Sequence, residues 1–318
     1  MNIVYASDEN FAEIMGVSIV SLFENNKNIN KIDIYIIDDN ISMKNKKSLV
    51  SLSDSYNRNI YFITAPDISK TIGIKIDSQH WVVATYLRLF IVSLLPNNIE
   101  KTLYLDCDTI ILGSIDKLYN KDISSFHGAG VLNPFSEEEK LKIGLKAEDN
   151  YFNAGVLLLN IAKMRHDNIE KIFKNFIIKF NGMVPYNDQG VINGTIGNTI
   201  AVLPSVYNVL SLNFALSYKA MCKYMKSCIN YSESEYLKAI KHPIIIHFTG
   251  NIILLRPWIK GCTHPYSHEW LKYKDLSPWK CISLHENKQS IIHNILIRIY
   301  KLLPEIIAIR VARFIYKS

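Results

Sequence analysis

The sequence predicts an α/β protein with a mainly parallel mixed sheet, flanked by helices and followed by a helical C-terminal tail. Strand and helix signals alternate through the first half of the 318 residues. Such alternation is typical of parallel sheets that are covered by helices on both faces. Hydrophobic residues make up 48% of the chain and charged residues 20%, which is typical of a folded globular protein.

Short apolar runs that end in polar residues are the predicted strands of the first half. They lie at 2–8, 32–39, 59–65 and 101–112. Between them, segments with apolar residues at helical spacing are predicted helices. These lie at 11–24, 41–56 and 81–96, and Pro96 stops the last one. Ligands bind beyond the carboxyl ends of the strands in such sheets, so the polar residues gathered there mark a candidate site.

The second half is less regular. Apolar or extended stretches lie at 126–132, 151–164, 200–210 and 242–250, and a helix is predicted near 167–180. Residues 211–241 show no clear period and are interpreted as a variable insertion. Residues 257–285 are aromatic and rich in predicted loops.

The positive charge is concentrated at the C-terminal end. Residues 286–318 hold six lysines and arginines against two glutamates, which accounts for +4 of the net charge of +7. This argues against nucleic acid as a partner of the main domain and favours contact of the tail with an anionic surface. Five cysteines without zinc-like spacing predict a reduced, cytosolic chain. We see no secretory signal and no uncharged apolar run of membrane-spanning length.

Asp106 and Asp108 are the first candidate site residues, within KTLYLDCDTIIL. Residues i and i+2 of a strand point to the same face, so the two carboxylates should face one spot and Cys107 the apolar layer. Two facing carboxylates repel each other, and a divalent cation is their natural partner. The alternative is a strand end whose acids only reach water.

His247 is the second candidate. His242 and His247 are five residues apart in HPIIIHFTG, so a regular strand would send them to opposite faces. A neutral imidazole suits Mn²⁺-type metals alongside carboxylates, and Gly250 allows the backbone to turn closely around a ligand. The alternative is an isolated histidine at a strand end.

Further polar residues have two interpretations each. Asn187, Asp188 and Gln189 either start a helix or aim a carboxylate and an amide into a pocket. Asn153 precedes small residues that permit close ligand approach or a tight bend. Arg88 is a lone charge in an apolar helix, either snorkelling at the surface or reaching a phosphate or carboxylate. No P-loop, dinucleotide-binding, α/β-hydrolase or zinc-protease motif is present.

Six motifs in order resemble glycosyltransferase family 8, and most closely its bacterial lipopolysaccharide galactosyl- and glucosyltransferases. They are NIVYASDENF, ATYLRLFIVSLLP, LYLDCDTIIL, FNAGVLLLN, NDQGVIN and HFTG…RPW, from about residue 2 to 258. The resemblance implies a GT-A fold, a UDP-hexose donor carrying galactose or glucose, a glycolipid or oligosaccharide acceptor, and retention of anomeric configuration. It also implies Mn²⁺ as cofactor, with Mg²⁺ as an alternative.

The resemblance implies roles for single residues. The implied uridine contacts are Ala6, Asp8 and Asn10, and the implied metal ligands are Asp106, Asp108 and His247. The implied contacts of the donor sugar are Arg88, Asn153, Asp188 and Gln189, of which Asp188 and Gln189 are the candidate catalytic residues. Gly250 would let the backbone approach the phosphates. We favour attack on the same face as the departing phosphate over a Gln189 nucleophile, because an amide is a poor nucleophile.

The chain departs from the family pattern at two places. A lysine usually stands three residues after the glycine and just before the PW pair, but here NIILLR separates Gly250 from Pro257. Arg256 is the expected replacement, and Lys260 is the alternative or an additional contact. Family members often carry an acid near the acceptor pocket, where this chain has Asn133.

The resemblance implies a catalytic domain at 1–258, with a donor-binding half at about 1–112 and an acceptor and donor-sugar half at about 113–258. An extension follows at 259–285, then a basic tail at 286–318 with two helical stretches hinged at Pro304. An apolar stripe with a basic flank predicts a tail that lies on an anionic membrane, hence peripheral binding to the inner face of the cytoplasmic membrane. Packing of the tail on the enzyme's own core is the alternative.

Two other functions are alternatives. A metal-dependent nucleotidyltransferase would need a basic loop near the N-terminus, and residues 5–16 contain no lysine or arginine. A sugar-nucleotide or glycan-binding module without turnover would not need the full set of donor-sugar residues. Because this chain has that set, the sequence favours a transferase over a binding module.

Overall fold

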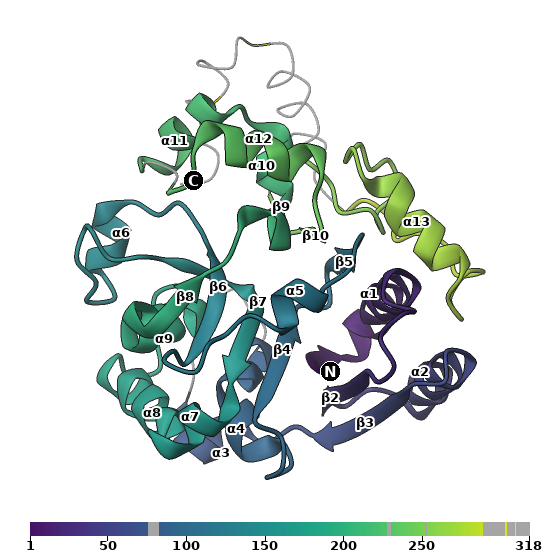
Figure 1. The fold of residues 1–318 in the computed structure, drawn as a ribbon, viewed down its shortest axis with the longest axis horizontal. Coiled ribbons are helices and arrows are strands. Elements are labelled where there is room, and N and C mark those ends of the chain that lie inside the picture. The colour runs from purple at the N-terminus through teal and green to yellow at the C-terminus, as the bar shows by residue number, and fades with distance from the viewer. Residues whose placement is uncertain (76–82, 228–229, 252, 289–302, 304–308, 310–318) are drawn as a thin grey trace.

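The computed structural model describes residues 1–75, 83–227, 230–251 and 253–288, together with Leu303 and Ile309. A seven-stranded sheet in the order β3-β2-β1-β4-β7-β6-β8 forms its centre (Figure 1). Neighbours from β3 to β4 are parallel, β7 is antiparallel to both β4 and β6, and β8 is parallel to β6. The predicted mainly parallel mixed sheet is therefore confirmed. The strands are β1 Asn2–Asp8, β2 Asp33–Asp39, β3 Asn59–Thr64, β4 Lys101–Leu105, β6 Gly128–Leu132, β7 Phe152–Asn160 and β8 Ile200–Val202.

A second, three-stranded sheet lies beside the first and has the order β5-β10-β9. Its strands are β5 Thr109–Ile111, β9 Val209–Leu210 and β10 Ile245–His247. The prediction of one continuous strand over 101–112 is wrong, because the chain leaves the large sheet after Leu105 and enters the small one at Thr109. Asp106, Cys107 and Asp108 form the link between the sheets.

Helices surround these sheets, and one continuous hydrophobic core joins them. The α-helices are α1 Ala12–Asn25, α2 Met43–Ser55, α3 Ile68–Ile72, α4 Ile91–Leu94, α5 Asp116–Tyr119, α6 Glu137–Leu141, α7 Ile161–His166, α8 Ile169–Lys179, α9 Asn187–Ile196, α10 Ser211–Ala215, α11 Tyr218–Met225, α12 Glu233–Lys241 and α13 Ser267–Asp275. The 3₁₀ helices are η1 Glu9–Phe11, η2 Val83–Phe90, η3 Gly197–Thr199 and η4 Ser205–Tyr207.

Several predicted elements need correction. The described part of the apolar helix predicted at 81–96 begins at residue 83 and is a 3₁₀ helix, η2, followed by the short α4, which ends just before Pro96. Residues 211–241, which show no period in the sequence, contain α10, α11 and α12. Each of these helices is short, so tertiary packing and not a long amphipathic pattern defines it. His242 caps the C-terminus of α12 and does not share a strand with His247.

The predicted tail helices at 288–317 fall almost entirely outside the described residues. Ile309 is described, and its side chain is buried with 1% exposure; it is not a member of the predicted apolar stripe. In the described part of the chain, no helix is both long and apolar enough to span a bilayer.

Candidate active site

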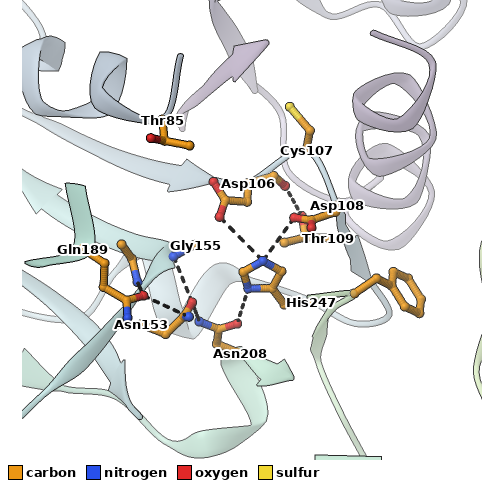
Figure 2. Close-up of polar contacts among 12 residues, drawn as sticks. Thr85, Asp106, Cys107, Asp108, Thr109, Asn153, Gly155, Gln189, Asn208 and His247 are labelled. Carbon is orange, nitrogen blue, oxygen red and sulfur yellow. Dashed lines mark hydrogen bonds and ion pairs between the residues drawn. The ribbon is translucent and has the colours of Figure 1, made fainter. Parts of the chain in front are cut away.

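Three side chains from distant parts of the chain converge at the junction of the two sheets (Figure 2). The His247 Nε2 atom lies 3.1 Å from Asp108 Oδ1 and 3.5 Å from Asp106 Oδ2. One ligand atom from each of the three residues lies within 4.8 Å of the others. The antiparallel pairing of β10 with β5 places His247 opposite Thr109, directly after the two acids. Sheet pairing therefore brings the imidazole to the carboxylates although His247 follows Asp108 by 139 positions in the sequence.

Asn208 sets the orientation of the His247 ring. His247 Nδ1 lies 3.1 Å from Asn208 Oδ1, and Asn208 Nδ2 donates to Asn153 Oδ1 at 2.8 Å. The asparagine oxygen therefore accepts from Nδ1–H, which leaves Nε2 facing the two carboxylates. Partners of this kind fix the tautomer of metal-binding histidines. We did not identify Asn208 from the sequence; its one signal is a lone amide inside the apolar run VYNVL.

The charges at this junction are strongly coupled. Burial lowers the pKa of His247, but the neighbouring Asp108 carboxylate outweighs it and raises that pKa. Burial likewise opposes ionisation of Asp108, yet the charge and hydrogen bond of His247 lower the pKa of Asp108. The two carboxylates thus favour positive charge at the point that Nε2 faces, and a divalent cation would supply that charge with the imidazole neutral.

Arg88 bridges the acid pair to a second carboxylate. Its Nη2 lies 2.8 Å from Asp106 Oδ1 and its Nε lies 2.9 Å from Asp188 Oδ2, while Nη1 donates to Ala154 O at 2.8 Å. The side chain is only 9% exposed, so snorkelling at the surface is excluded. The guanidinium also lies over the Tyr104 ring, 4.6 Å from its centroid. A planar fork is the group that can hold two carboxylates in this fixed arrangement.

Asp188 is held at the start of α9 and is not a helix cap. Tyr186 and Asn187 have φ values of 63° and 51°, in the left-handed region that few non-glycine residues adopt. Strained backbone of this kind clusters at functional sites. Burial is the main cause that raises the pKa of Asp188 to about 6, with Arg88 acting against the shift and Asp106 adding to it.

Both ends of the Gln189 side-chain amide form hydrogen bonds with neighbouring residues. Its Oε1 accepts from the Ala154 backbone N–H at 3.0 Å and from Asn153 Nδ2 at 3.2 Å. Its Nε2 donates to the Tyr151 hydroxyl at 3.0 Å. The side-chain oxygen of Gln189 therefore already accepts two hydrogen bonds within the protein.

Gly155 makes room for the imidazole. A Cβ atom at this position would lie 2.2 Å from His247 Cε1 and 2.7 Å from Asp106 Oδ2. The sequence offered close ligand approach or a tight bend for the small residues after Asn153. The group that approaches Gly155 in the structure is the His247 side chain, and ligand approach stays a prediction.

The predicted uridine residues lie at the carboxyl end of β1, next to the acid link. Cys107 Sγ donates to Ala6 O at 3.1 Å, which joins the two segments. The carboxylate of Asp8 accepts from the Phe11 N–H and from Asn10 Nδ2, both at 3.1 Å. The half-buried Asp8 and the exposed Asn10 thus belong to one hydrogen-bonded loop beside the acid pair.

The 250–256 segment brings Arg256, and not Lys260, to the acids. Arg256 Nη2 lies 3.6 Å from Asp108 Oδ2, and its Nε donates to Phe248 O at 3.2 Å. A Cβ atom on Gly250 would lie 3.3 Å from that same Nη2. Lys260 is paired with Glu286 at the surface.

The described residues fit a divalent cation. Two carboxylates and one imidazole with its second nitrogen fixed are a donor set that Mn²⁺ accepts. Two cationic side chains, Arg88 and Arg256, flank the same carboxylates, so an anion bound beside the metal would meet further positive charge.

The fold and this arrangement define the class of protein, a GT-A glycosyltransferase. The structure matches that of the galactosyltransferase LgtC solved with donor and acceptor sugar analogues, with a TM-score of 0.72 and 25% identity over 87% of this chain and 96% of that one.

Within that class, the chain belongs to glycosyl transferase family 8, whose family model matches residues 2–261. A Haemophilus influenzae protein described as a glycosyltransferase is 30% identical over 278 residues, 84% of this chain and 76% of that protein. The lipopolysaccharide 1,2-glucosyltransferase of Escherichia coli K12 is 27% identical over 297 residues, 92% of this chain and 82% of that protein. The predicted family, fold and hexosyltransferase class are therefore confirmed.

Proposed function

We propose that the chain is a retaining transferase that moves galactose or glucose from a UDP-sugar to a lipopolysaccharide, lipooligosaccharide or other surface glycan, with Mn²⁺ or Mg²⁺ bound. The observation that supports this most is the convergence of Asp106, Asp108 and His247 beside the Arg88–Asp188 pair. The printed activities of relatives, a lipopolysaccharide glucosyltransferase and a galactosyltransferase, support the acceptor and sugar classes.

In this proposal the chain's own residues bind and orient the donor. Ala6, Asp8 and Asn10 would hold the uridine at the end of β1, and Gly250 with Arg256 would meet the diphosphate. A cation held by Asp106, Asp108 and His247 would stabilise the charge that develops on the departing UDP. Arg88 fixes Asp106 relative to Asp188, so the metal side and the sugar side of the site keep one geometry.

Asp188 and Gln189 would face the donor sugar together with Asn153. An ionised Asp188 would stabilise the positive charge that develops at the anomeric carbon as the bond to UDP breaks. Gln189, held by Tyr151 and the Ala154 backbone, would position Asn153 and would not attack. The acceptor hydroxyl would then approach on the face that UDP leaves, with the departing phosphate taking its proton.

A cavity next to the site is the proposed acceptor side. Asn153 and Asn208 form its wall towards the acid pair. The rest of the lining is largely apolar, with the amides of Asn133 and Asn213. Apolar walls with a few placed amides suit the faces and hydroxyls of an uncharged sugar.

The deciding experiment is a donor screen. Purified protein is incubated with UDP-galactose or UDP-glucose, with Mn²⁺, with Mg²⁺ or with EDTA, and UDP release and transfer to an oligosaccharide acceptor are measured. We expect metal-dependent release with one of the two donors. Undiminished transfer in EDTA would refute the metal site, and donor binding without any turnover would identify a binding module.

We also propose that the tail at 286–318 binds an anionic membrane surface. Substituting Arg310, Arg313 and Lys317 by glutamine should reduce sedimentation with vesicles that contain phosphatidylglycerol, because each basic residue near such a surface contributes about 1 kcal/mol. Equal binding of the variant and the unaltered protein, or equal binding to neutral vesicles, would contradict this proposal.

A further inference from the structure

Residues 259–285 follow the Arg256 segment and return to the N-terminal part of the chain. The Lys260 N–H donates to His285 O at 2.9 Å and the His285 N–H donates to Trp258 O at 2.8 Å, so both ends of the extension are joined beside Trp258. Between these ends, α13 lies alongside α1 (Figure 1). The extension therefore connects the Arg256 segment to the helix that follows the predicted uridine loop.

Two contacts of this extension involve the first two turns of α1. The buried Lys274, 4% exposed, pairs its Nζ with Glu13 and donates to Trp279 O at 2.8 Å. The Trp279 indole, 3% exposed, packs against the α1 backbone at Gly16, where a Cβ atom would lie 2.1 Å from the ring. Glu13 follows the Asp8–Phe11 loop by two residues, so these contacts fix the direction in which that loop leaves β1.

A third contact reaches the loop itself. Trp279 Nε1 donates to Asn45 Oδ1 at 3.0 Å, and Asn45 Nδ2 donates to Glu9 Oε1 at 2.9 Å. The Ser42 N–H donates to Glu9 Oε2 at 2.7 Å. Glu9 stands between Asp8 and Asn10, so a chain of hydrogen bonds runs from the extension to the residues that would hold the uridine.

We infer that residues 259–285 act as a clamp on the nucleotide-binding loop, and that Trp279, acting through Asn45 and Glu9, is a positioning residue for the donor. The inference rests on the proposed UDP-sugar function. It assigns the extension a role in donor affinity, where a packing role alone would affect stability and leave affinity unchanged. Trp279 does not touch the substrate; it holds the loop that does.

The test compares two substitutions at the same α1–α13 interface. Trp279→Phe keeps an aromatic ring facing α1, removes part of the contact with Gly16, and removes the N–H that bonds Asn45. Tyr273→Phe removes one hydroxyl, which accepts from Asn25 Nδ2 at 2.7 Å. Asn25 ends α1, about 20 Å along the helix from the loop, so this control removes a hydrogen bond that does not lead to Glu9.

Loss of one hydrogen bond in the chain to Glu9 should raise the Kd of UDP with Mn²⁺, and the KM of the UDP-sugar, about three- to tenfold. The kcat should stay within about twofold of the unaltered protein, since the loop contributes to binding and not to the reacting atoms. Tyr273→Phe should leave both constants unchanged, even if it lowers the Tm by a similar amount. An equal rise of KM in both variants, or no rise in Trp279→Phe, would overturn the inference.

Asn45→Asp provides a second, independent test. It keeps the acceptor for Trp279 Nε1 but faces the Glu9 carboxylate with a like charge, so the KM of the donor should rise and the rise should shrink at high salt. An unchanged KM would overturn the inference. Titration of the unaltered protein with UDP and Mn²⁺ distinguishes a failure of the proposed function from a failure of the clamp inference. No binding there refutes the proposed function itself, whereas normal binding with unaffected variants refutes the clamp alone.

Discussion

Replacement of Asp188 is the most direct test of the site, because we expect it to increase the stability of the protein and to decrease its activity. Its pKa is raised from an ordinary value of 3.8 to about 6. The folded protein thus holds the proton more tightly than the unfolded chain does. The stabilising contribution of the neutral carboxyl is full below about pH 4 and is lost as the pH rises through about 6. Above that pH, the buried charge costs about 3 kcal/mol of folding free energy.

Asp188→Asn keeps the shape of the side chain and removes the charge. We expect the free energy of unfolding to increase by up to about 3 kcal/mol at pH 8 and to change little at pH 4. For a chain of this size, that gain corresponds to roughly 5 °C in Tm at the higher pH. Transfer activity should fall strongly in the same variant, and the activity of the unaltered enzyme should decline as the pH drops below about 6.

The assay is thermal and urea unfolding from pH 4 to pH 8, with EDTA present so that metal binding does not add to stability. Asp67→Asn is the matched control, because Asp67 is exposed and accepts the Lys70 N–H as a helix cap, which lowers its pKa. That variant should gain nothing at pH 8. An Asp188→Asn protein that is no more stable than the unaltered protein at pH 8 would refute the reasoning about burial.

Three further changes test the metal junction. Gly155→Ala should displace His247 and abolish the Tm increase that Mn²⁺ causes, whereas Gly113→Ala, where the nearest atom would be 3.7 Å away, should retain it. Asn208→Ala should weaken Mn²⁺ binding about 10- to 100-fold by calorimetry, because the imidazole loses its orienting partner; unchanged affinity would contradict that role. Arg88→Lys should lower kcat/KM, since an ammonium cannot bridge two carboxylates as the guanidinium does, and normal kinetics would exclude the bridge.

The sequence alone allowed most of the regular elements to be predicted. The three N-terminal strands and the helices α1 and α2 match their predicted ranges within two residues. The strands are apolar runs bounded by polar residues, the helices have apolar residues at helical spacing, and α2 begins at a capping serine. Residues 211–241 could not be predicted in the same way. The helices there are too short for their period to stand out, and contacts between them stabilise them, such as the hydrogen bond from the Tyr236 hydroxyl to Asn213 O.

The acid pair shows how a correct site can follow from an incorrect local structure. We expected Asp106 and Asp108 to share a face because they share a strand, but they form a link between two sheets. Both carboxylates nevertheless face the His247 imidazole. The link lies where β4, in the large sheet, ends and β5, in the small sheet, begins, so both side chains stay at the junction of the two sheets. The roles of Asn208 and Gly155 depend on that junction and could not be predicted from residue type.

Residue types and their order thus determined the fold class, the family and the candidate ligands, since periodicity and motif spacing are local properties of the chain. The tertiary structure decided the contacts of those ligands: which nitrogen of His247 faces the acids, that Arg88 joins Asp106 to Asp188, and that Trp279 is connected to Glu9. Each of these depends on the pairing of strands or the packing of helices far apart in sequence, and a hydrogen bond forms only when such packing brings donor and acceptor to about 3 Å.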